Sequence, residues 1–190
     1  LQLVSNNSPI EAGVKMLPVA LAGAIASLAA PSLARLTSSR AVLASGVGVA
    51  GIGLILIGLQ PGDLSVSMVL AALTLVGFGT GSLALGSAMI MFGTPESTAG
   101  SAAALEESSY EIGSVLGIAI LGSIAALLFR AEFEAGQLLG QLDTATSAAA
   151  EESIGSAIAI ANELNMPALA QEASIAFTHS LQTTGLIGGV

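Results

Sequence analysis

The chain has 190 residues, of which 53% are hydrophobic and only 9% are charged, and its mean hydropathy is +0.87. Soluble domains usually carry about 25% charged residues, so this composition excludes an ordinary soluble domain and indicates an integral membrane protein. The formal net charge of −9 argues against nucleic acid as a partner, and the absence of cysteine excludes disulfides and thiolate metal sites.

Uncharged runs over 16–34, 41–59, 64–95 and 112–129 are close to or above the roughly 20 apolar residues that cross a bilayer. They predict an all-α integral membrane fold with membrane helices over 14–34, 41–59, 64–92 and 99–129. Residues 1–13 predict the end of a preceding helix and an outer turn, and 173–190 predict the start of a last membrane helix, truncated at Val190. The chain starts without Met or a signal peptide, so we expect it to be a fragment.

The connection over 35–40 carries Arg35 and Arg40, and short basic connections usually face the cytoplasm. We therefore predict that 35–40 is cytoplasmic. Counting helices from there predicts that 93–98 is also cytoplasmic and that 130–172 is extracytoplasmic.

The predicted outer segment over 130–172 differs from the rest of the chain because it is acidic. Its apolar residues Ile154, Ile158, Ala161 and Leu164 recur at helical spacing, which predicts a partly helical loop with two short amphipathic helices. The segment is either a solvated loop or a vestibule that attracts cations. Its acids are Glu132, Glu134, Asp143, Glu151, Glu152, Glu163 and Glu172.

Glycines recur within the predicted membrane helices, most densely at Gly77, Gly79 and Gly81. No strand, turn and helix pattern surrounds them, so they do not indicate a dinucleotide loop. Small residues let membrane helices approach closely, and we predict that these glycines serve helix packing. Helix bending during a transport cycle is a second interpretation.

Three carboxylates, Glu106, Glu107 and Glu111, lie together on the predicted helix over 99–129. An ionised side chain at a membrane helix centre costs about 2.5 kcal/mol or more, which makes the three acids a functional-site hypothesis. At 1.5 Å per residue, Glu107 lies about 15 Å beyond Ser97, near the predicted middle of the membrane.

No base lies on this helix before Arg130, so the acids need protons, a cationic ligand or a base from elsewhere. Desolvation and mutual repulsion favour uptake of a proton by at least one of them. Tyr110 is well placed to contact a lipophilic cation with its ring. Alternatively, the acids cap the cytoplasmic helix end and bond to Ser108, Ser109 or water.

The run GSAAALEESSYEIGSVLGIA, residues 100–119, resembles helix thirteen of the fourteen-helix drug:proton antiporters of the major facilitator superfamily. It is most similar to the branch that exports quaternary ammonium compounds, the QacA and SmvA type. The motifs LQ at 1–2, SPIEAG at 8–13 and LP at 17–18 are similar to the end of helix nine and the start of helix ten. A long outer segment before the last helix is also typical of this branch.

The resemblance implies a C-terminal helical bundle of the major facilitator fold, with the five predicted membrane helices as helices ten to fourteen. It implies export of hydrophobic mono- and divalent cations, such as quaternary ammonium antiseptics, dyes and other drugs, in exchange for protons across the bacterial cytoplasmic membrane. The partners implied are these drugs, protons, the bilayer and the remaining helices of the same transporter, without a cofactor or a metal.

By the same resemblance, Glu106, Glu107 and Glu111 are proton-coupling and cation-recognition positions, with Glu107 the first choice, and Tyr110 is a substrate contact. Some relatives have a further acid inside helix ten, but this chain has none between Glu11 and Asp63.

Two other functions remain open from the sequence. An intramembrane glutamate-dependent hydrolase would need a basic residue near the paired acids and helical histidines, but Glu111 stands there and His179 is the sole histidine. A lone histidine is a weak metal or proton-relay signal, so we predict that His179 is hydrogen-bonded at the interface. A non-transporting membrane scaffold or sensor is the other alternative.

Overall fold

The computed structural model describes residues 8–60, 62 and 65–190, and within these ranges it contains helices and no strand, which confirms the all-α prediction. Four helical segments are long and apolar enough to cross a membrane: Ile10–Leu36, Ser39–Gly58, Val66–Gly93 and Glu96–Glu134. The last helix is not one of these four. The helices are α2 (Pro9–Leu36), α3 (Ser39–Gly58), α4 (Val66–Gly81), α5 (Ala84–Gly93), η1 (Glu96–Thr98), α6 (Ala99–Glu134), η2 (Leu139–Gln141), α7 (Thr144–Glu151), α8 (Ile154–Glu163) and α9 (Pro167–Gly189).

Helix α2 begins earlier than the sequence predicts. Ser8 is its N-cap: the Ser8 side chain accepts a hydrogen bond from the Glu11 backbone, and Glu11 Oε2 accepts one from the Ser8 backbone at 2.9 Å. This reciprocal pair satisfies two free N–H groups at the helix start, with Pro9 in the first turn. The predicted outer turn over 1–13 is therefore helical from residue 9 onward, and its residues 1–7 lie outside the described part.

The predicted helix over 64–92 is divided into α4 and α5 at Ser82 and Leu83. Both residues keep right-handed helical angles, but backbone bonds there run to the third residue back, as from Leu83 N–H to the Thr80 carbonyl at 3.0 Å. The Ser82 hydroxyl also donates to the Gly79 carbonyl at 2.7 Å. Glycine is a poor α-helix former, so the glycine-rich end of α4 accommodates this short change from α-helical to tighter 3-10 hydrogen bonding.

Glycines hold α2, α3 and α4 in close contact. A Cβ added at Gly79 would lie 2.3 Å from the Gly46 carbonyl oxygen, and one added at Gly81 would lie 2.3 Å from the Gly23 carbonyl oxygen. A Cβ at Gly53 would lie 2.6 Å from the Ala72 oxygen. These distances leave no room for a side chain, so at these positions the glycines serve helix packing.

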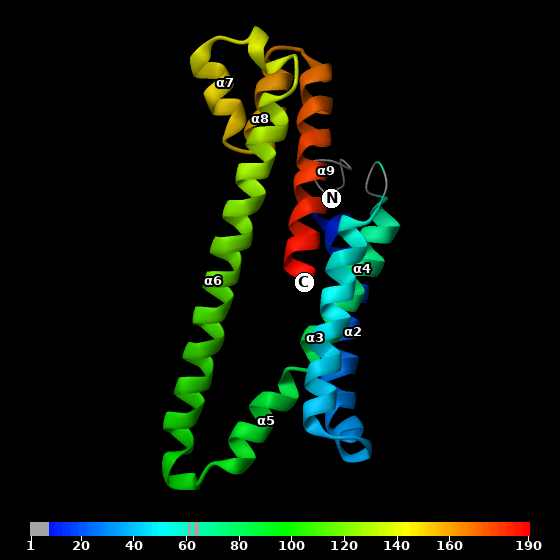
Figure 1. Cartoon of the computed structure of the whole chain (residues 1–190), viewed down its shortest axis with the longest axis vertical. Helices are drawn as coiled ribbons and strands as arrows, with labels where there is room; N and C mark the ends of the chain where they lie inside the picture. Colours follow the sequence, from blue (N-terminus) through cyan, green and yellow to red (C-terminus); the bar gives the residue numbers. More distant parts are fainter. Residues whose placement is uncertain (1–7, 61, 63–64) are drawn as a thin grey trace.

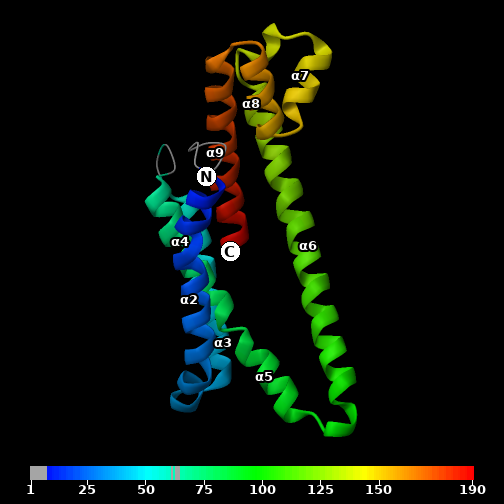
Figure 2. The ribbon, with the colours of Figure 1, turned by 180° about the vertical axis from the view of Figure 1, so that it is seen from behind.

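Figures 1 and 2 show α2, α3 and α4 as one bundle, and α6 as a separate long helix that α5 joins to the bundle at one end. Helix α9 lies between α6 and the bundle at one end, where α7 and α8 also lie. At the opposite end are the turn from α2 to α3 and the turn from α5 to α6. The two connections that the sequence predicts to be cytoplasmic thus share one end of the molecule, and the membrane side of that end remains a prediction.

The acidic lobe, which we define as residues 135–166, shares a well-packed core with the adjoining ends of α6 and α9. Phe133 and Leu169 are fully buried, and Phe129 stacks on Phe133 with ring centroids 5.5 Å apart. The lobe is shorter than the predicted loop over 130–172, because α6 continues to Glu134 and α9 already begins at Pro167. Burial of apolar side chains of α6 and α9 against α7 and α8 stabilises these longer forms of α6 and α9. The cluster comprises Phe129, Phe133, Leu139, Ala150, Ile154, Ala157, Ala161, Leu169, Ala173 and Ala176.

Acids in the lobe and on the adjoining start of α9 also have local structural roles. Asp143 caps α7 and accepts hydrogen bonds from the Ala145 and Thr146 backbones at 3.1 and 3.2 Å. Hydrogen bonds from Thr146 lower the pKa of Asp143. Glu172 accepts a hydrogen bond from the Leu138 backbone at 3.4 Å, which ties α9 to the chain leaving α6. These carboxylates therefore contribute to the fold of the lobe as well as to its charge.

The glycine contacts make a stability prediction. Replacement of Gly79 with Ala would drive a methyl group into the Gly46 carbonyl, and overpacking of this kind costs about 1–3 kcal/mol. We expect a lower melting temperature of the purified complete protein. The matched control is Gly48→Ala on α3, where nothing lies within 4 Å and alanine is the better helix former. Equal melting temperatures for the two variants would contradict the packing.

A second prediction concerns the acidic lobe. Phe133→Ala removes a fully buried ring, which costs about 3–5 kcal/mol, and we expect limited proteolysis to cleave residues 135–166 faster than in the wild type. Phe92→Ala is the matched control, because the Phe92 side chain is 92% exposed in the described chain. Unchanged cleavage in the Phe133 variant would show that the lobe does not depend on this core.

Candidate functional site

The predicted acids all lie on the first half of α6, and the structure distinguishes them by exposure. Glu106 is half-buried, whereas Glu107 and Glu111 are exposed and the Tyr110 residue is 64% exposed. Successive residues of a helix point about 100° apart, so Glu107 and Glu111 share one face while Glu106 and Tyr110 share the next. One helix thus presents carboxylates on two adjacent faces.

Glu106 is bound to the neighbouring helix. The hydroxyl of Ser87, on α5, donates a hydrogen bond to Glu106 Oε1 across the turn that joins α5 to α6. Ser87 lies roughly two turns before the end of α5 and Glu106 roughly two turns after the start of α6, so the bond joins the two helices at equal distance from the turn. The sequence analysis missed Ser87, since the spacing between the two residues follows no helical period.

Glu107 and Glu111 have no hydrogen bond or ion pair with any residue in the described part of the chain. The sequence left open that the acids bond to Ser108 or Ser109. The Ser109 hydroxyl instead donates to the Leu105 carbonyl at 2.7 Å. Both carboxylates are therefore available to a proton, a cation or another part of the protein.

The acids lie toward the end of the molecule that holds the turn from α2 to α3. Leu85 of α5 packs with Ala30 and Val42, close to that turn, and Ser87 follows two residues later. The hydrogen bond to Ser87 places Glu106 at the level of α5 (Figure 1). Glu111 lies about 6 Å further along α6 than Glu107. The position of Glu107 at the middle of the membrane stays a prediction.

The face of α6 that carries Glu106 also carries Gly113 and Gly117 at helical spacing. A Cβ at either glycine would meet nothing within 4 Å, unlike the glycines where α2, α3 and α4 cross. Apolar neighbours such as Ile112 and Ile118 are also exposed. This part of α6 is therefore shaped for close contact but lacks a contact partner within the described residues.

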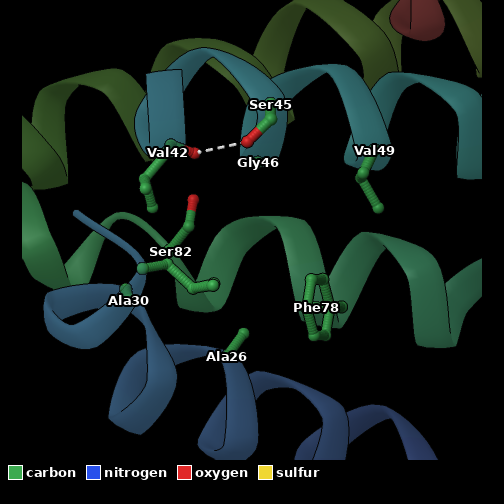
Figure 3. A pocket seen from close by; sticks show the side chains of 9 residues that line it. Ala26, Ala30, Val42, Ser45, Gly46, Val49, Phe78 and Ser82 are labelled. Atoms are coloured by element: carbon green, nitrogen blue, oxygen red, sulfur yellow. Dashed lines mark hydrogen bonds between the residues drawn. The ribbon is translucent and has the colours of Figure 1, made fainter. Parts of the chain in front are cut away.

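The cavity between α2, α3 and α4 is too small to be a drug site (Figure 3). Its volume is about 60 Å³, whereas sites for drug-sized ligands occupy about 300–1,000 Å³. The Ser45 and Ser82 hydroxyls beside it donate to carbonyls of their own helices at 3.0 and 2.7 Å. The cavity is a space left by helix packing.

No basic side chain of the described residues is paired with Glu106, Glu107 or Glu111. Arg35 and Arg40 flank the turn from α2 to α3, and their charge is the basis for predicting that this turn is cytoplasmic. Arg130 donates through Nε to the Glu151 carbonyl at 3.3 Å, in the acidic lobe. A cation that neutralises Glu107 or Glu111 must therefore be a bound ligand or a residue outside the described part of the chain.

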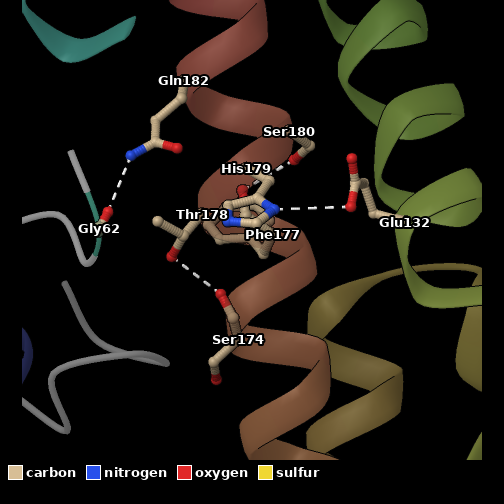
Figure 4. A network of polar contacts seen from close by, with 8 residues as sticks. All are labelled: Gly62, Glu132, Ser174, Phe177, Thr178, His179, Ser180 and Gln182. Atoms are coloured by element: carbon tan, nitrogen blue, oxygen red, sulfur yellow. Dashed lines mark hydrogen bonds and ion pairs between the residues drawn. The ribbon is translucent and has the colours of Figure 1, made fainter. Parts of the chain in front are cut away.

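His179 lies in a polar network that joins α9 to its neighbours (Figure 4). Its Nδ1 is 3.5 Å from Glu132 Oε2, and both side chains are 50% exposed. Gln182 Nε2 donates to the Gln60 and Gly62 carbonyls at 2.9 and 3.0 Å. No group of three or more His, Asp or Glu side chains in residues 8–60, 62 and 65–190 is arranged to hold a metal ion.

The fold and the acids on α6 define the class as a helical membrane protein with ionisable groups on a membrane-capable helix. No family model matches the sequence. The multidrug efflux pump LfrA of Mycolicibacterium smegmatis is 30% identical over 194 aligned residues, which cover 100% of this chain and 38% of the pump. The methyl viologen resistance protein SmvA of Salmonella typhimurium is 37% identical over 167 residues, which cover 86% of this chain and 33% of that protein.

The chain belongs to the family of these efflux proteins, which confirms the resemblance to the drug antiporters of the major facilitator superfamily. It spans 38% and 33% of the lengths of these two relatives. Their names favour a transporter over the hydrolase that the sequence left open.

We predict that His179 is dispensable for transport. The contact between His179 and Glu132 is half-exposed, and contacts of this kind contribute about 0–1 kcal/mol, so His179→Asn should change the melting temperature of the complete transporter only slightly and leave drug export within about twofold of the wild type. A more than tenfold loss of export at normal membrane levels would instead indicate that His179 takes part in proton or drug movement.

Proposed function

We propose that this chain is part of a transporter that exports hydrophobic mono- and divalent cations across the bacterial cytoplasmic membrane in exchange for protons. The observation that carries the proposal is the exposure of Glu107 and Glu111 on one face of a membrane-capable helix, without a partner in the described residues. The efflux names of the relatives agree with it.

Cation export is consistent with the need of the carboxylates on α6 for a compensating positive charge. A carboxylate in a membrane is costly unless a counter-charge or a proton accompanies it. Glu107 and Glu111 lie one turn apart on the same face, so a cation bound between them would offset both charges. Two carboxylates on one face also suit a dication such as methyl viologen, the compound in the name of one relative.

A transport cycle follows from the competition between drug and proton. In the inward-open state, the deprotonated acids bind the cationic drug. In the outward-open state, protons displace the drug and neutralise the acids, and the transporter returns. Glu107 is the first choice for this exchange, Glu106 and Glu111 assist, and the ring of Tyr110 contacts the bound cation.

The arrangement of the helices suits entry of the drug from the cytoplasm. The acids lie toward the end that holds Arg35 and Arg40, which the positive-inside rule assigns to the cytoplasm. The bilayer and the other helices of the complete transporter would then enclose the rest of the path.

The test is export of a fluorescent lipophilic cation from cells that express the complete transporter under an imposed proton gradient. We expect Glu107→Gln to reduce gradient-driven export at least tenfold while membrane levels remain normal, since glutamine keeps the shape but cannot bind a proton or carry charge. Glu163→Gln on the exposed side of α8 is the matched control and should export normally.

Normal export by the Glu107 variant would move the exchange to Glu106, Glu111 or residues elsewhere. Absence of export in the wild type would leave a non-transporting scaffold or sensor as the better interpretation.

A further inference from the structure

We propose that Ser87 is a positioning residue: its hydroxyl holds the Glu106 carboxylate against α5, so that the adjacent acids Glu106 and Glu107 have different roles. Glu106 ties α6 to α5, and Glu107 faces the transported cation. This inference rests on the proposed function for its effect on export, and on the Ser87 to Glu106 hydrogen bond for its geometry.

Helix α5 is attached on two opposite sides. Leu85 is buried in a cluster with Ala30 and Val42, on α2 and α3, whereas Ser87 bonds to Glu106 on α6. Two residues along a helix correspond to a rotation of about 200°, so the two side chains leave α5 in nearly opposite directions. Helix α5 therefore bridges the bundle and the helix that carries the acids.

The division between α4 and α5 gives α5 this bridging position. The tightened turn at Ser82 and Leu83 separates α5 from α4, and Leu83 makes no side-chain capping bond at the start of α5. Short stretches of tightened helix often mark hinges. Figures 1 and 2 show α5 leaving the bundle and reaching the first turn of α6.

The bond to Ser87 fixes which side of the first half of α6 faces α5. Glu107 points about 100° away from Glu106, and Glu111 shares its face. When Glu106 is held against α5, Glu107 and Glu111 are directed away from that contact, where both are exposed. Without the bond, the first half of α6 loses its side-chain hydrogen bond to α5, and the other two acids are held less firmly away from α5.

The contact can be tested separately from transport, because these 190 residues contain no cysteine. In the complete transporter, with any cysteines elsewhere replaced, we expect the pair Ser87→Cys and Glu106→Cys to form a disulfide on mild oxidation in membranes. The matched control, Ser87→Cys with Glu107→Cys, places the second thiol on the adjacent face and should remain reactive toward a thiol reagent. Preferential cross-linking of the control pair would overturn the proposal.

The functional test compares single variants for export of a fluorescent lipophilic cation. A hydrogen bond to a charged group is worth about tenfold in an equilibrium, so we expect Ser87→Ala to lower the maximum export rate about tenfold with little change in the apparent KM. Ser87→Thr keeps the hydroxyl and should restore export. Ser27→Ala is the matched control, because the Ser27 hydroxyl donates only to the Ala24 carbonyl of its own helix at 2.9 Å.

The outcomes separate the two proposals. Export by the wild type with an unaffected Ser87→Ala variant overturns the role of Ser87 and leaves the proposed function intact. Equal losses in the Ala and Thr variants also overturn it, since a hydroxyl would then be irrelevant. If the wild type does not export, the proposed function fails and the role of Ser87 in transport fails with it, whatever the cross-linking shows.

Discussion

Close contact between helix backbones at glycines is the interaction on which the bundle depends. Lipid tails are as apolar as leucine side chains, so burial of apolar surface contributes little to the association of membrane helices. Close van der Waals packing must stabilise their association instead. In this chain the carbonyl oxygens of Val19, Gly23 and Gly46 occupy the space in which side chains at Gly77, Gly81 and Gly79 would lie. Close backbone contact therefore holds the three helices together.

The same glycine run has a second effect, which positions the acids. Glycine is a poor helix former, and the run from Gly77 to Gly81 leads directly into the tightened turn at Ser82 and Leu83. Residues that favour close packing thus also separate α5 from α4. Because α5 is separate, Leu85 can stay against α2 and α3 while Ser87 reaches Glu106.

Local features of the sequence predicted the membrane helices and the acids, because hydropathy and charge are properties of short segments. The sequence did not predict contacts between distant residues. Phe133 and Leu169 lie far apart within the predicted acidic loop, and no local pattern indicates that they pack into one core. Ser87 resembles any other serine of an apolar helix, and only the fold brings its hydroxyl to Glu106.

The glycines of the bundle and those of α6 differ in their surroundings, and this difference indicates where the cation site of the complete transporter lies. Glycines of the bundle lie against neighbouring backbones, whereas a Cβ added at Gly113 or Gly117 on α6 would meet nothing within 4 Å in the described residues. These two lie on the same face as Glu106, and the faces with Glu107 and Glu111 adjoin it. A helix that approached α6 at these glycines would enclose the adjoining acids between two backbones. Enclosure would exclude lipid from Glu107, and a proton or a cationic drug would then be the natural counter-charge.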